Sequence, residues 1–431
     1  MTLATYPNVI SNALRWFRNP YAFLDDAQAR HGPTFRVALP GLGRPLLTGD
    51  PQLIRKIVAN KDLVGGKGIH IMRALFGSDS LIMLQGETHQ QHRRVLAAPF
   101  RPGRIARYDE LTMQTGLEVM QSIPYDQPFS MFEVVREITQ TVIIRFVFGR
   151  LSPEQEADVS SLLMDFMTSF DNPLILFLKP LHVDLGARSP WGRAIRNRMR
   201  LQNFIFQQVR SFRETSANRH SVLAHIVAHG ELSESEVVSE LSSLLMFGHD
   251  TTAATLSWAF AHIYSHPEAV TRIRQEAFID QEGESGVSFL KACINESMRL
   301  CPIVVQLFRM AEQDIRISRH PVRKNEMVMP CPYLAHHNPM VFPEPQRFMP
   351  ERFMKGDGYL NSFFPYGFGT RLCIGRPLAQ QQMPLILSTA IKHMNFSLAS
   401  NDCPLPVRYM FFMAPQHGTL MVRKHQPALK A

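Results

Sequence analysis

One cysteine stands out by the residues around it. Cys373 lies in the stretch FPYGFGTRLCIGRP, residues 364–377, and Arg371 precedes it by two positions. Three glycines surround it: Gly367, Gly369 and Gly375. Glycine lets the backbone approach a flat ligand closely, and amide groups in a tight turn donate hydrogen bonds to a thiolate sulfur. We therefore expect Cys373 to be ionised at neutral pH and to bind a metal through its sulfur.

Two other interpretations of this loop compete. A dinucleotide-binding loop requires GxGxxG, and Leu372 occupies the place of the third glycine. A lone cysteine is also most often a buried, inert residue. The loop alone leaves this choice open, and other motifs of the chain bear on it.

FPYGFGTRLCIG resembles the haem-binding loop of the cytochrome P450 family, in which the cysteine thiolate is the axial iron ligand. The resemblance implies a haem b cofactor with Cys373 as the metal ligand, and Gly367, Gly375 and Arg371 as further cofactor-binding residues. Tyr366 is a departure, because the family usually has Phe seven residues before the cysteine. This position lies near the sulfur in the family, so the exchange bears on the reduction potential.

The stretch FGHDTT, residues 247–252, resembles the oxygen-activation motif of the same family. The resemblance assigns catalytic roles to three residues: Gly248 leaves room for dioxygen, Thr251 faces it, and Asp250 relays protons. The alternative is a helix with polar residues on an exposed face, but the glycine alone costs ~1 kcal/mol of helix propensity. Phe247 replaces the small residue of the family, and we expect its ring to narrow the space over the haem.

In NESMRLCP, Glu296 and Arg299 are three residues apart and share a helix face, where they can form an ion pair. Such a pair contributes little on a protein surface. The stretch matches the ExxR motif of the family, and Arg352 in PERF matches the second arginine of its buried triad. The implied role is structural, since the triad fixes the loop that carries Cys373.

In GETHQQHRRVLAAPF, His89 and Arg93 lie at i and i+4 on one helix face. A haem presents two propionates, and arginine suits carboxylate binding. By resemblance, His89 and Arg93 bind these propionates together with Arg371 and Arg309. The alternative of His89 as a metal ligand is less favoured, because no second ligand accompanies it.

The resemblance implies a monooxygenase that inserts one oxygen atom from O2 into a hydrophobic substrate, with the haem carrying the oxidation. The sequence contains no flavin or nicotinamide fingerprint, so electrons from NAD(P)H are expected through a separate ferredoxin and its reductase, docking on the basic side near Cys373. A haem sensor, or an enzyme of peroxide-driven or redox-neutral rearrangement, is the alternative. The pair Asp250 and Thr251 favours the monooxygenase.

By resemblance, the substrate pocket draws on four parts of the chain: the segment 66–84, the helix around Phe247, Val304 with Val305, and the turn at Met410 and Phe411. Residues 164–186 correspond to an access lid. All are largely apolar, which favours a fatty acid, a terpenoid or a polyketide-like substrate. The alternative is that these side chains are core, the commoner position of Phe and Met.

The elements that position these motifs are mostly helical. Helices are predicted to start at Asn19-Pro20 and Asp50-Pro51, with a hairpin around Gly41 and Gly43 between them. Residues 105–300 have helical patterning, including one central helix of ~30 residues or ~45 Å. Ser233 and Glu236 form a capping box at its start, and His266-Pro267 ends it.

Beyond residue 300 the prolines become dense, which predicts small sheets and loops. The predicted fold is mainly α with small β-sheets, and the resemblance implies the triangular helical haem domain with a minor β-rich side. No linker or repeat interrupts the chain, so we expect one domain over residues 1–431.

The composition limits which binding partners and which cellular location we expect. The net charge is +9, but the basic residues form no runs with interleaved aromatics, so no nucleic-acid partner is expected. Five cysteines without a CxxC pair indicate neither a disulfide framework nor a zinc site. No signal peptide and no stretch of ~18 apolar residues is present, so we expect a soluble, cytoplasmic monomer.

Overall fold

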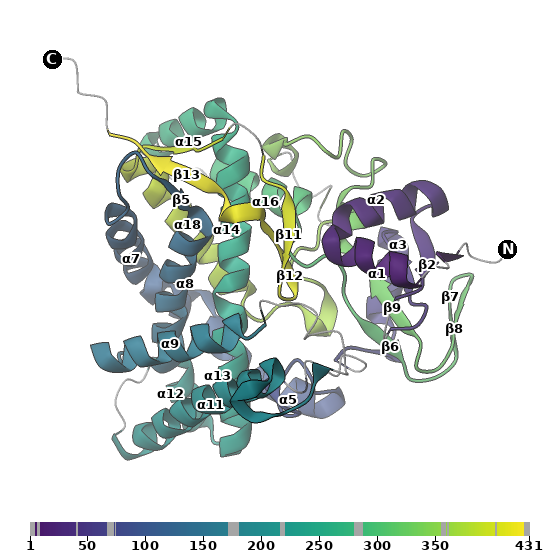
Figure 1. Cartoon of the computed structure of the whole chain (residues 1–431), viewed down its shortest axis with the longest axis horizontal. Helices are drawn as coiled ribbons and strands as arrows, with labels where there is room; N and C mark the ends of the chain where they lie inside the picture. The colour runs from purple at the N-terminus through teal and green to yellow at the C-terminus, as the bar shows by residue number, and fades with distance from the viewer. Residues whose placement is uncertain are drawn as a thin grey trace.

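The fold is helix-rich, with a smaller β-rich part. A computed structural model describes the chain except residues 1–4, 7–8, 40–41, 67–72, 74, 171–180, 216–219, 280–287, 355–358, 360–361, 401–402 and 426–431. Figure 1 shows the N-terminal helices and strands grouped on one side of the molecule and the longer helices on the other. The prediction of a mainly helical protein with small sheets is confirmed.

The described α-helices have the following bounds: α1 Val9–Arg18, α2 Pro20–His31, α3 Pro51–Ala59, α5 Gly86–Ala97, α6 Pro102–Ile105, α7 Asp109–Gln121, α8 Met131–Phe148, α9 Pro153–Thr168, α11 Pro190–Thr215, α12 Val222–His229, α13 Glu234–Gly248, α14 Asp250–Tyr264, α15 Pro267–Ile279, α16 Phe289–Leu300, α17 Pro332–His336 and α18 Arg376–His393. Short 3-10 helices include η5 Pro350–Phe353 and η7 Gly369–Arg371. Most of these helices fall between residues 105 and 300, as predicted.

The strands form four small sheets. The largest has the order β1-β2-β3-β9-β6-β4, and its strands are β1 Thr5–Tyr6, β2 Thr34–Val37, β3 Leu46–Thr48, β9 Met327–Pro330, β6 Arg309–Ala311 and β4 Leu63–Val64. A second has the order β10-β13-β5, with strands β10 Phe396–Leu398, β13 Leu420–Arg423 and β5 Pro128–Ser130. Two antiparallel pairs complete the set: β7 Ile315–Ile317 with β8 His320–Val322, and β11 Pro406–Tyr409 with β12 Phe412–Pro415.

The local signals at the element ends have the predicted structures. The Asn19 side chain accepts a hydrogen bond from the N–H of Ala22, and Ser233 with Glu236 forms the capping box of α13. Strands β2 and β3 form the predicted hairpin, with Gly43 at a positive φ of 71° between them. Gly41 lies outside the described residues.

The predicted single central helix is wrong in one respect, because it breaks at His249 into α13 and α14. Side chains compete there for the carbonyl groups of the helix. The Thr251 hydroxyl donates to the Phe247 carbonyl at 2.8 Å, and the His249 ring places its Nδ1 2.8 Å from the Leu245 carbonyl oxygen. Such bonds offer the backbone an alternative to its helical ladder and bend helices.

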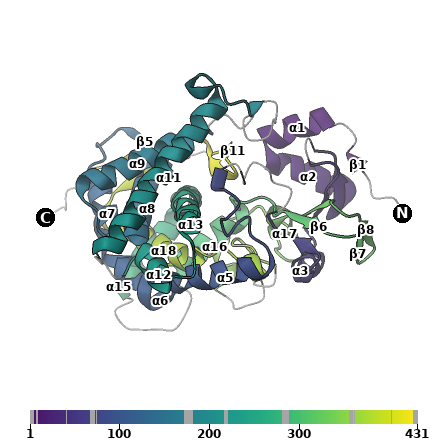
Figure 2. The ribbon, with the colours of Figure 1, turned by 90° about the horizontal axis from the view of Figure 1, so that it is seen from below.

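Helix α14 is the centre of the packing. It contacts α8, α16, α15 and α18, and its Trp258 and Phe260 side chains are fully buried. Figure 2 shows α13 nearly end-on, with α8, α11, α16 and α18 around it. Because neighbours surround the central pair of helices on several sides, their polar residues must find partners inside the protein.

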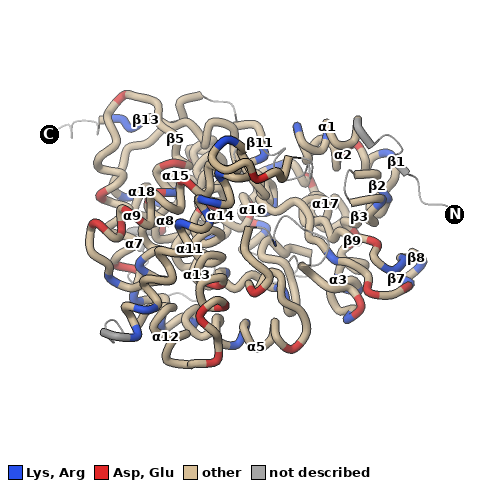
Figure 3. Tube along the Cα trace, turned by 60° about the horizontal axis from the view of Figure 1, so that its bottom comes forward, with Lys and Arg blue, Asp and Glu red and all other residues tan. Residues whose placement is uncertain are grey.

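Charge is distributed without one dominant band. In the view of Figure 3, Lys and Arg positions alternate with Asp and Glu positions over the helices. Within the described residues, no helix combines the length and the apolar character needed to cross a membrane.

Candidate functional site

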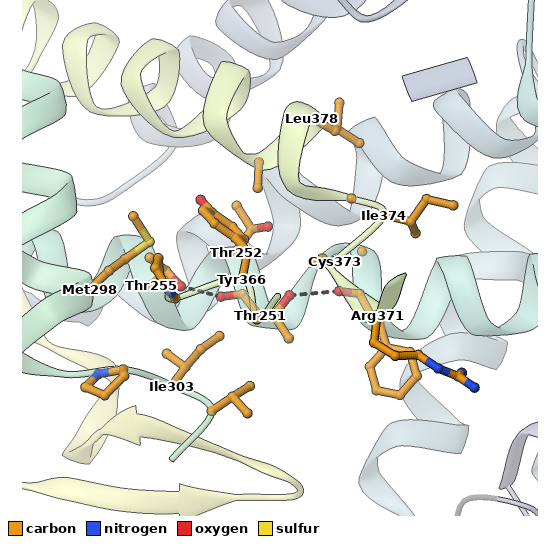
Figure 4. Close-up of a pocket in the computed structure, with 18 of the residues that line it drawn as sticks. Thr251, Thr252, Thr255, Met298, Ile303, Tyr366, Arg371, Cys373, Ile374 and Leu378 are labelled. Carbon is orange, nitrogen blue, oxygen red and sulfur yellow. Dashed lines mark hydrogen bonds between the residues drawn. The ribbon is translucent and has the colours of Figure 1, made fainter. Parts of the chain in front are cut away.

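A cavity of about 390 Å³ lies between α14, the chain after α16 and the loop before α18. Its walls are mainly apolar, and they come from segments far apart in the sequence: Ile82, Phe100, Ile143, Leu244, Phe247, Met298, Ile303, Val304, Leu307, Ile374 and Leu378. The polar side chains at the cavity include Thr251, Thr252, Arg309, Arg371 and Cys373. Figure 4 shows Thr251 on α14 and Cys373 on the loop that leads into α18.

The cysteine loop is a tight turn that only glycine accommodates at two positions. Gly367 and Gly369 have φ values of 74° and 61°, and a Cβ at Gly369 would meet the Val58 side chain at 2.9 Å. The Cys373 N–H donates to the Tyr366 carbonyl at 2.9 Å, which closes the turn. The loop then passes directly into α18, so Cys373 lies next to a helix N-terminus.

The Cys373 side chain has accessible surface because it faces the cavity. It is surrounded by protein and not by bulk solvent, so its thiol is desolvated. Burial raises its pKa, while the N–H groups of Gly375 and Arg376 and the charge of Arg93 lower it. Burial outweighs the others, so the expectation that the loop alone ionises the thiol is wrong. A coordinated metal ion would deprotonate the thiol and so supply the missing stabilisation.

Four basic side chains, His89, Arg93, Arg309 and Arg371, gather beside the cysteine loop. Burial lowers the pKa of His89 to about 4, with the charges of Arg371 and Arg93 adding to the effect. Burial lowers the pKa of Arg371 to about 10, with Arg309 and Arg93 contributing. Within the described residues, none of the four has an ion pair with a carboxylate.

The arginines of this group are held by neutral acceptors instead. Arg93 donates to the Leu372 carbonyl at 2.7 Å, and Arg371 donates to the Leu81 carbonyl at 3.0 Å and to Gln85 Oε1 at 2.9 Å. Buried like charges without a counter-ion are unfavourable, so the cluster requires an anionic ligand. A haem fits this donor set, because its iron would take the Cys373 sulfur and its two propionates would neutralise the cations.

The FGHDTT residues of α13 and α14 fall into two groups according to whether they line the cavity. Phe247, Gly248 and Thr251 line the cavity, whereas Asp250 is almost fully buried and outside its lining. Asp250 lies on the side of α8, where its charge contributes to raising the pKa of Glu133 after burial. The structure therefore places the Thr251 side chain at the cavity and the adjacent Asp250 side chain in the interior on the α8 side.

Gly248 lies directly against another helix, α8. A Cβ at this position would meet Cγ1 and Cδ1 of Ile143 in α8, both at 2.6 Å. The glycine thus permits close contact between α8 and the central helices, whatever space it also leaves beside the cavity. Phe247 packs against Phe76 with 4.7 Å between ring centroids, so its ring is held in place at the cavity wall.

The structure brings the ExxR residues together in the interior. Arg299 binds Glu296 through two hydrogen bonds of 2.8 and 2.9 Å, and the Nε of Arg352 lies 3.3 Å from Glu296 Oε1. The Glu296 and Arg299 side chains are fully buried. Bidentate geometry of this kind is the strong form of an arginine–carboxylate pair.

A histidine that sequence reasoning missed connects this triad to the cysteine loop. Arg299 donates to the His336 carbonyl at 2.9 Å, and the His336 Nε2 accepts from the Phe364 N–H at 3.0 Å. Burial lowers the pKa of His336 well below its usual value, so the ring is neutral and its Nδ1 carries the proton. No signal in the single sequence points to His336, because its two partners are distant along the chain.

Some predicted pocket residues do not line the cavity. Val304 does, but Val305 points away from it and packs in the core with Trp16 and Met413. Met410 and Phe411 stand behind the lining, in the same core cluster as Phe247. The reason is packing: buried apolar side chains look alike in sequence whether they face a cavity or a neighbour.

The segment 66–84 and the predicted lid are only partly described. Ile82 lines the cavity and Phe76 is core, whereas residues 67–72 and 74 lie outside the described residues. In the segment 164–186, Phe166 and Phe170 are core residues, and residues 171–180 lie outside the described part. The described portion of the predicted lid is therefore divided, because Phe166 and Phe170 are core whereas Leu181, Val183 and Leu185 are exposed.

Comparisons with known proteins agree with this geometry. The sequence model of the family described as cytochrome P450 matches residues 6–422. Cytochrome P450 137 of Mycobacterium tuberculosis is 27% identical over 402 residues, which cover 90% of this chain and 83% of that protein. Cytochrome P450 138 of Mycobacterium tuberculosis is 29% identical over 378 residues, covering 84% and 82%.

Solved structures share the fold. A retinoic acid-bound cyanobacterial CYP120A1 superposes with a TM-score of 0.82 at 20% identity, covering 96% of each chain. A six-coordinated cytochrome P450 from Thermus thermophilus superposes with a TM-score of 0.73 at 20% identity, covering 94% of this chain and 98% of that one. With a family match over nearly its whole length, the chain belongs to the cytochrome P450 family of haem-thiolate monooxygenases.

Proposed function

We propose that the chain is one haem domain over residues 1–431 that binds haem b through Cys373 and oxidises a large hydrophobic substrate with electrons from separate proteins. The observation that carries this proposal is one cavity with an open thiol, an apolar wall and two arginines, Arg309 and Arg371, next to which His89 and Arg93 lie, all four without a carboxylate partner among the described residues. The thiol suits iron, the basic side chains suit propionates, and the wall suits an apolar compound.

Each residue of the site then has a defined task. When bound, the haem supplies the oxidation with O2, as in the rest of the family. Cys373 would ligate the iron, and His89, Arg93, Arg309 and Arg371 would hold the propionates.

Thr251 also lines the cavity, and its hydroxyl donates its proton to the Phe247 carbonyl at 2.8 Å. Rotation of this hydroxyl would offer the proton to the cavity. Asp250, buried on the α8 side, would restore the proton that Thr251 gives up. The apolar lining excludes water from the reaction, so protons reach the cavity through these two residues.

The substrate class follows from the cavity wall. Met298, Ile303 and Val304 present hydrocarbon surface without an acidic side chain, which supports a fatty acid, a terpenoid or a polyketide-like compound. Phe247, held by Phe76, narrows the cavity, so it is the residue we expect to select which substrate carbon is oxidised. The retinoic acid bound by the cyanobacterial relative gives a first isoprenoid compound to test.

Electrons are proposed to come from NAD(P)H through a ferredoxin reductase and a ferredoxin. The described surface around α5, α6 and the start of α18 carries exposed arginines on the side of the cysteine loop: Arg94, Arg101, Arg104 and Arg376. An acidic ferredoxin would be steered to this face, and added salt should slow the electron transfer.

The carbon monoxide difference spectrum of the reduced protein tests the proposed haem site. The wild-type protein should give the haem-thiolate band, and Cys373→Ser should abolish it. Cys403→Ser is the matched control, because Cys403 is exposed and away from the cavity lining, and it should leave the band unchanged. A Cys373→Ser protein with an unaltered spectrum would refute the site.

Turnover assays test the rest of the proposal. Long-chain fatty acids, retinoic acid and isoprenoid hydrocarbons should displace the water on the ferric iron and give oxidised products with NADPH, a ferredoxin and its reductase. Asp250→Asn should lower product formation by ~10²-fold and keep the haem spectrum. A peroxide-driven enzyme would instead retain its activity in this variant when supplied with hydrogen peroxide.

A further inference from the structure

The break between α13 and α14 places a histidine beside the acid of the site. His249 has no exposed surface and Asp250 is 1% exposed. The Nδ1 of His249 lies 2.8 Å from the Leu245 carbonyl oxygen. A carbonyl oxygen only accepts hydrogen bonds, so Nδ1 carries a proton. The other ring nitrogen, Nε2, faces Asp250 Oδ1 at 3.2 Å.

With a neutral ring and an ionised acid, His249 and Asp250 would lack a proton between their facing atoms. In a neutral ring with its proton on Nδ1, Nε2 has a bare lone pair. An ionised Asp250 would then face it with a second lone pair, in the protein interior. Neither His249 Nε2 nor either Asp250 carboxylate oxygen has a hydrogen-bond partner among the described residues. One further proton would make the pair neutral overall, either as a cationic ring 3.2 Å from a carboxylate or as a neutral ring beside a carboxyl group.

Helix α8 supplies the surroundings of this pair. The acceptors within reach of the Thr139 hydroxyl are the carbonyls of Val135 at 2.9 Å, Arg136 at 3.2 Å and His249 at 3.3 Å, so its proton is not directed to Asp250. The charged residues on this side are Glu133 and Arg136, which form an ion pair with each other. The Glu133 side chain is 53% exposed, and its pKa is raised by burial and by the charge of Asp250. The half-exposed Glu133 is therefore close enough to Asp250 for the two charges to interact.

We propose that His249 and Asp250 share one buried proton, and that His249 is a positioning residue that holds this proton on Nε2 for Asp250. In turnover the proton moves from Nε2 to Oδ1, and Asp250 gives it up toward Thr251, which leaves a neutral ring with its Nδ1 proton beside a carboxylate. A proton that enters from solvent then restores the shared one. The sharing of the proton stands by itself, whereas its use in turnover rests on the proposed function.

The chain contains a matched control for this inference. His337 is buried and directs its Nδ1 to the Tyr333 carbonyl four residues earlier, at 2.9 Å, as His249 does to Leu245. No carboxylate of the described residues contributes to its pKa, which burial lowers to about 4. At neutral pH His337 should therefore carry one ring proton, whereas His249 has an acid to share a second one with.

Nuclear magnetic resonance of protein labelled with ¹⁵N-histidine tests the sharing without any turnover. The His249 signals, assigned by their loss in His249→Asn, should show protons on both ring nitrogens near neutral pH, and those of His337 should show one. If the proton is on the carboxyl instead, infrared spectra should contain a protonated carboxyl band that Asp250→Asn removes. A singly protonated His249 together with no such band would overturn the proposal.

Two variants test the use of the proton. His249→Asn keeps a donor for the Leu245 carbonyl and removes Nε2, and His249→Gln keeps a polar group near Asp250 that does not titrate. In both, the haem spectrum should persist, and the share of electrons that ends in product should fall more steeply with rising pH than in wild type. A pH profile equal to wild type would overturn this role. Absence of turnover in every protein would refute the proposed function, while the spectroscopy still decides the proton sharing.

Discussion

Gly248→Ala, made in the wild-type protein and in an Ile143→Ala variant, tests whether Gly248 is needed for the close contact with α8. Gly248→Ala adds a methyl group whose carbon would lie 2.6 Å from two atoms of Ile143. Overpacking of this kind typically costs about 1–3 kcal/mol of folding free energy. The backbone of Gly248 has no positive φ, so the alanine gains ~1 kcal/mol of helix propensity. The net expectation is a loss of about 0–2 kcal/mol.

The second background is Ile143→Ala, which removes the steric conflict with the new methyl group. Ile143→Ala deletes both atoms that the new methyl group would meet, at a cost of about 2–5 kcal/mol by itself. In this background Gly248→Ala should stabilise the protein by ~1 kcal/mol, because only the helix propensity remains. The coupling between the two sites is then about 1–3 kcal/mol.

Urea unfolding followed by circular dichroism measures these differences, compared at equal m-values. Gly116→Ala in α7 is the control, because its Cβ would meet only one Ile138 atom at an ordinary 4.0 Å. It should stabilise the protein by about 0.5–1 kcal/mol. If Gly248→Ala destabilises both backgrounds equally, the contact with Ile143 is not its constraint, and our reasoning on Gly248 is refuted.

Three further predictions concern the supporting residues. Glu296→Gln leaves a buried arginine without its carboxylate and should cost about 3–5 kcal/mol in urea unfolding; a loss below about 1 kcal/mol would contradict the buried pair. His336→Leu leaves the Phe364 N–H without an acceptor, which should cost about 1–3 kcal/mol and reduce haem retention after gel filtration; unchanged retention would argue against the link to the cysteine loop. For His92, burial lowers the pKa, but the hydrogen bond and charge of Glu240 at 2.8 Å outweigh it and raise the pKa. The stabilisation is therefore complete below the unfolded pKa of ~6.5 and should be lost as pH rises through the folded pKa, whereas His92→Gln should lack this slope; identical slopes would show that the histidine is not linked to folding.

Short-range patterns predicted much of this protein correctly. The caps at Asn19 and Ser233 and the hairpin before Asp50 depend on neighbours within a few residues, so their structure follows from local sequence. The FGHDTT stretch was identified, but the break at His249 was not. At that break the Thr139 hydroxyl, from a residue 110 positions away along the chain, lies 3.3 Å from the His249 carbonyl oxygen.

Spacing along a helix determined that His89 with Arg93, and Glu296 with Arg299, share a face, because i+3 and i+4 side chains are neighbours on any helix. Which faces meet was decided only by the tertiary structure. It joined Arg371 to Gln85, directed Val305 into the core, and placed His336 between the buried triad and the cysteine loop. Packing brings together segments separated by tens to hundreds of residues, and no local pattern in one sequence predicts those tertiary contacts.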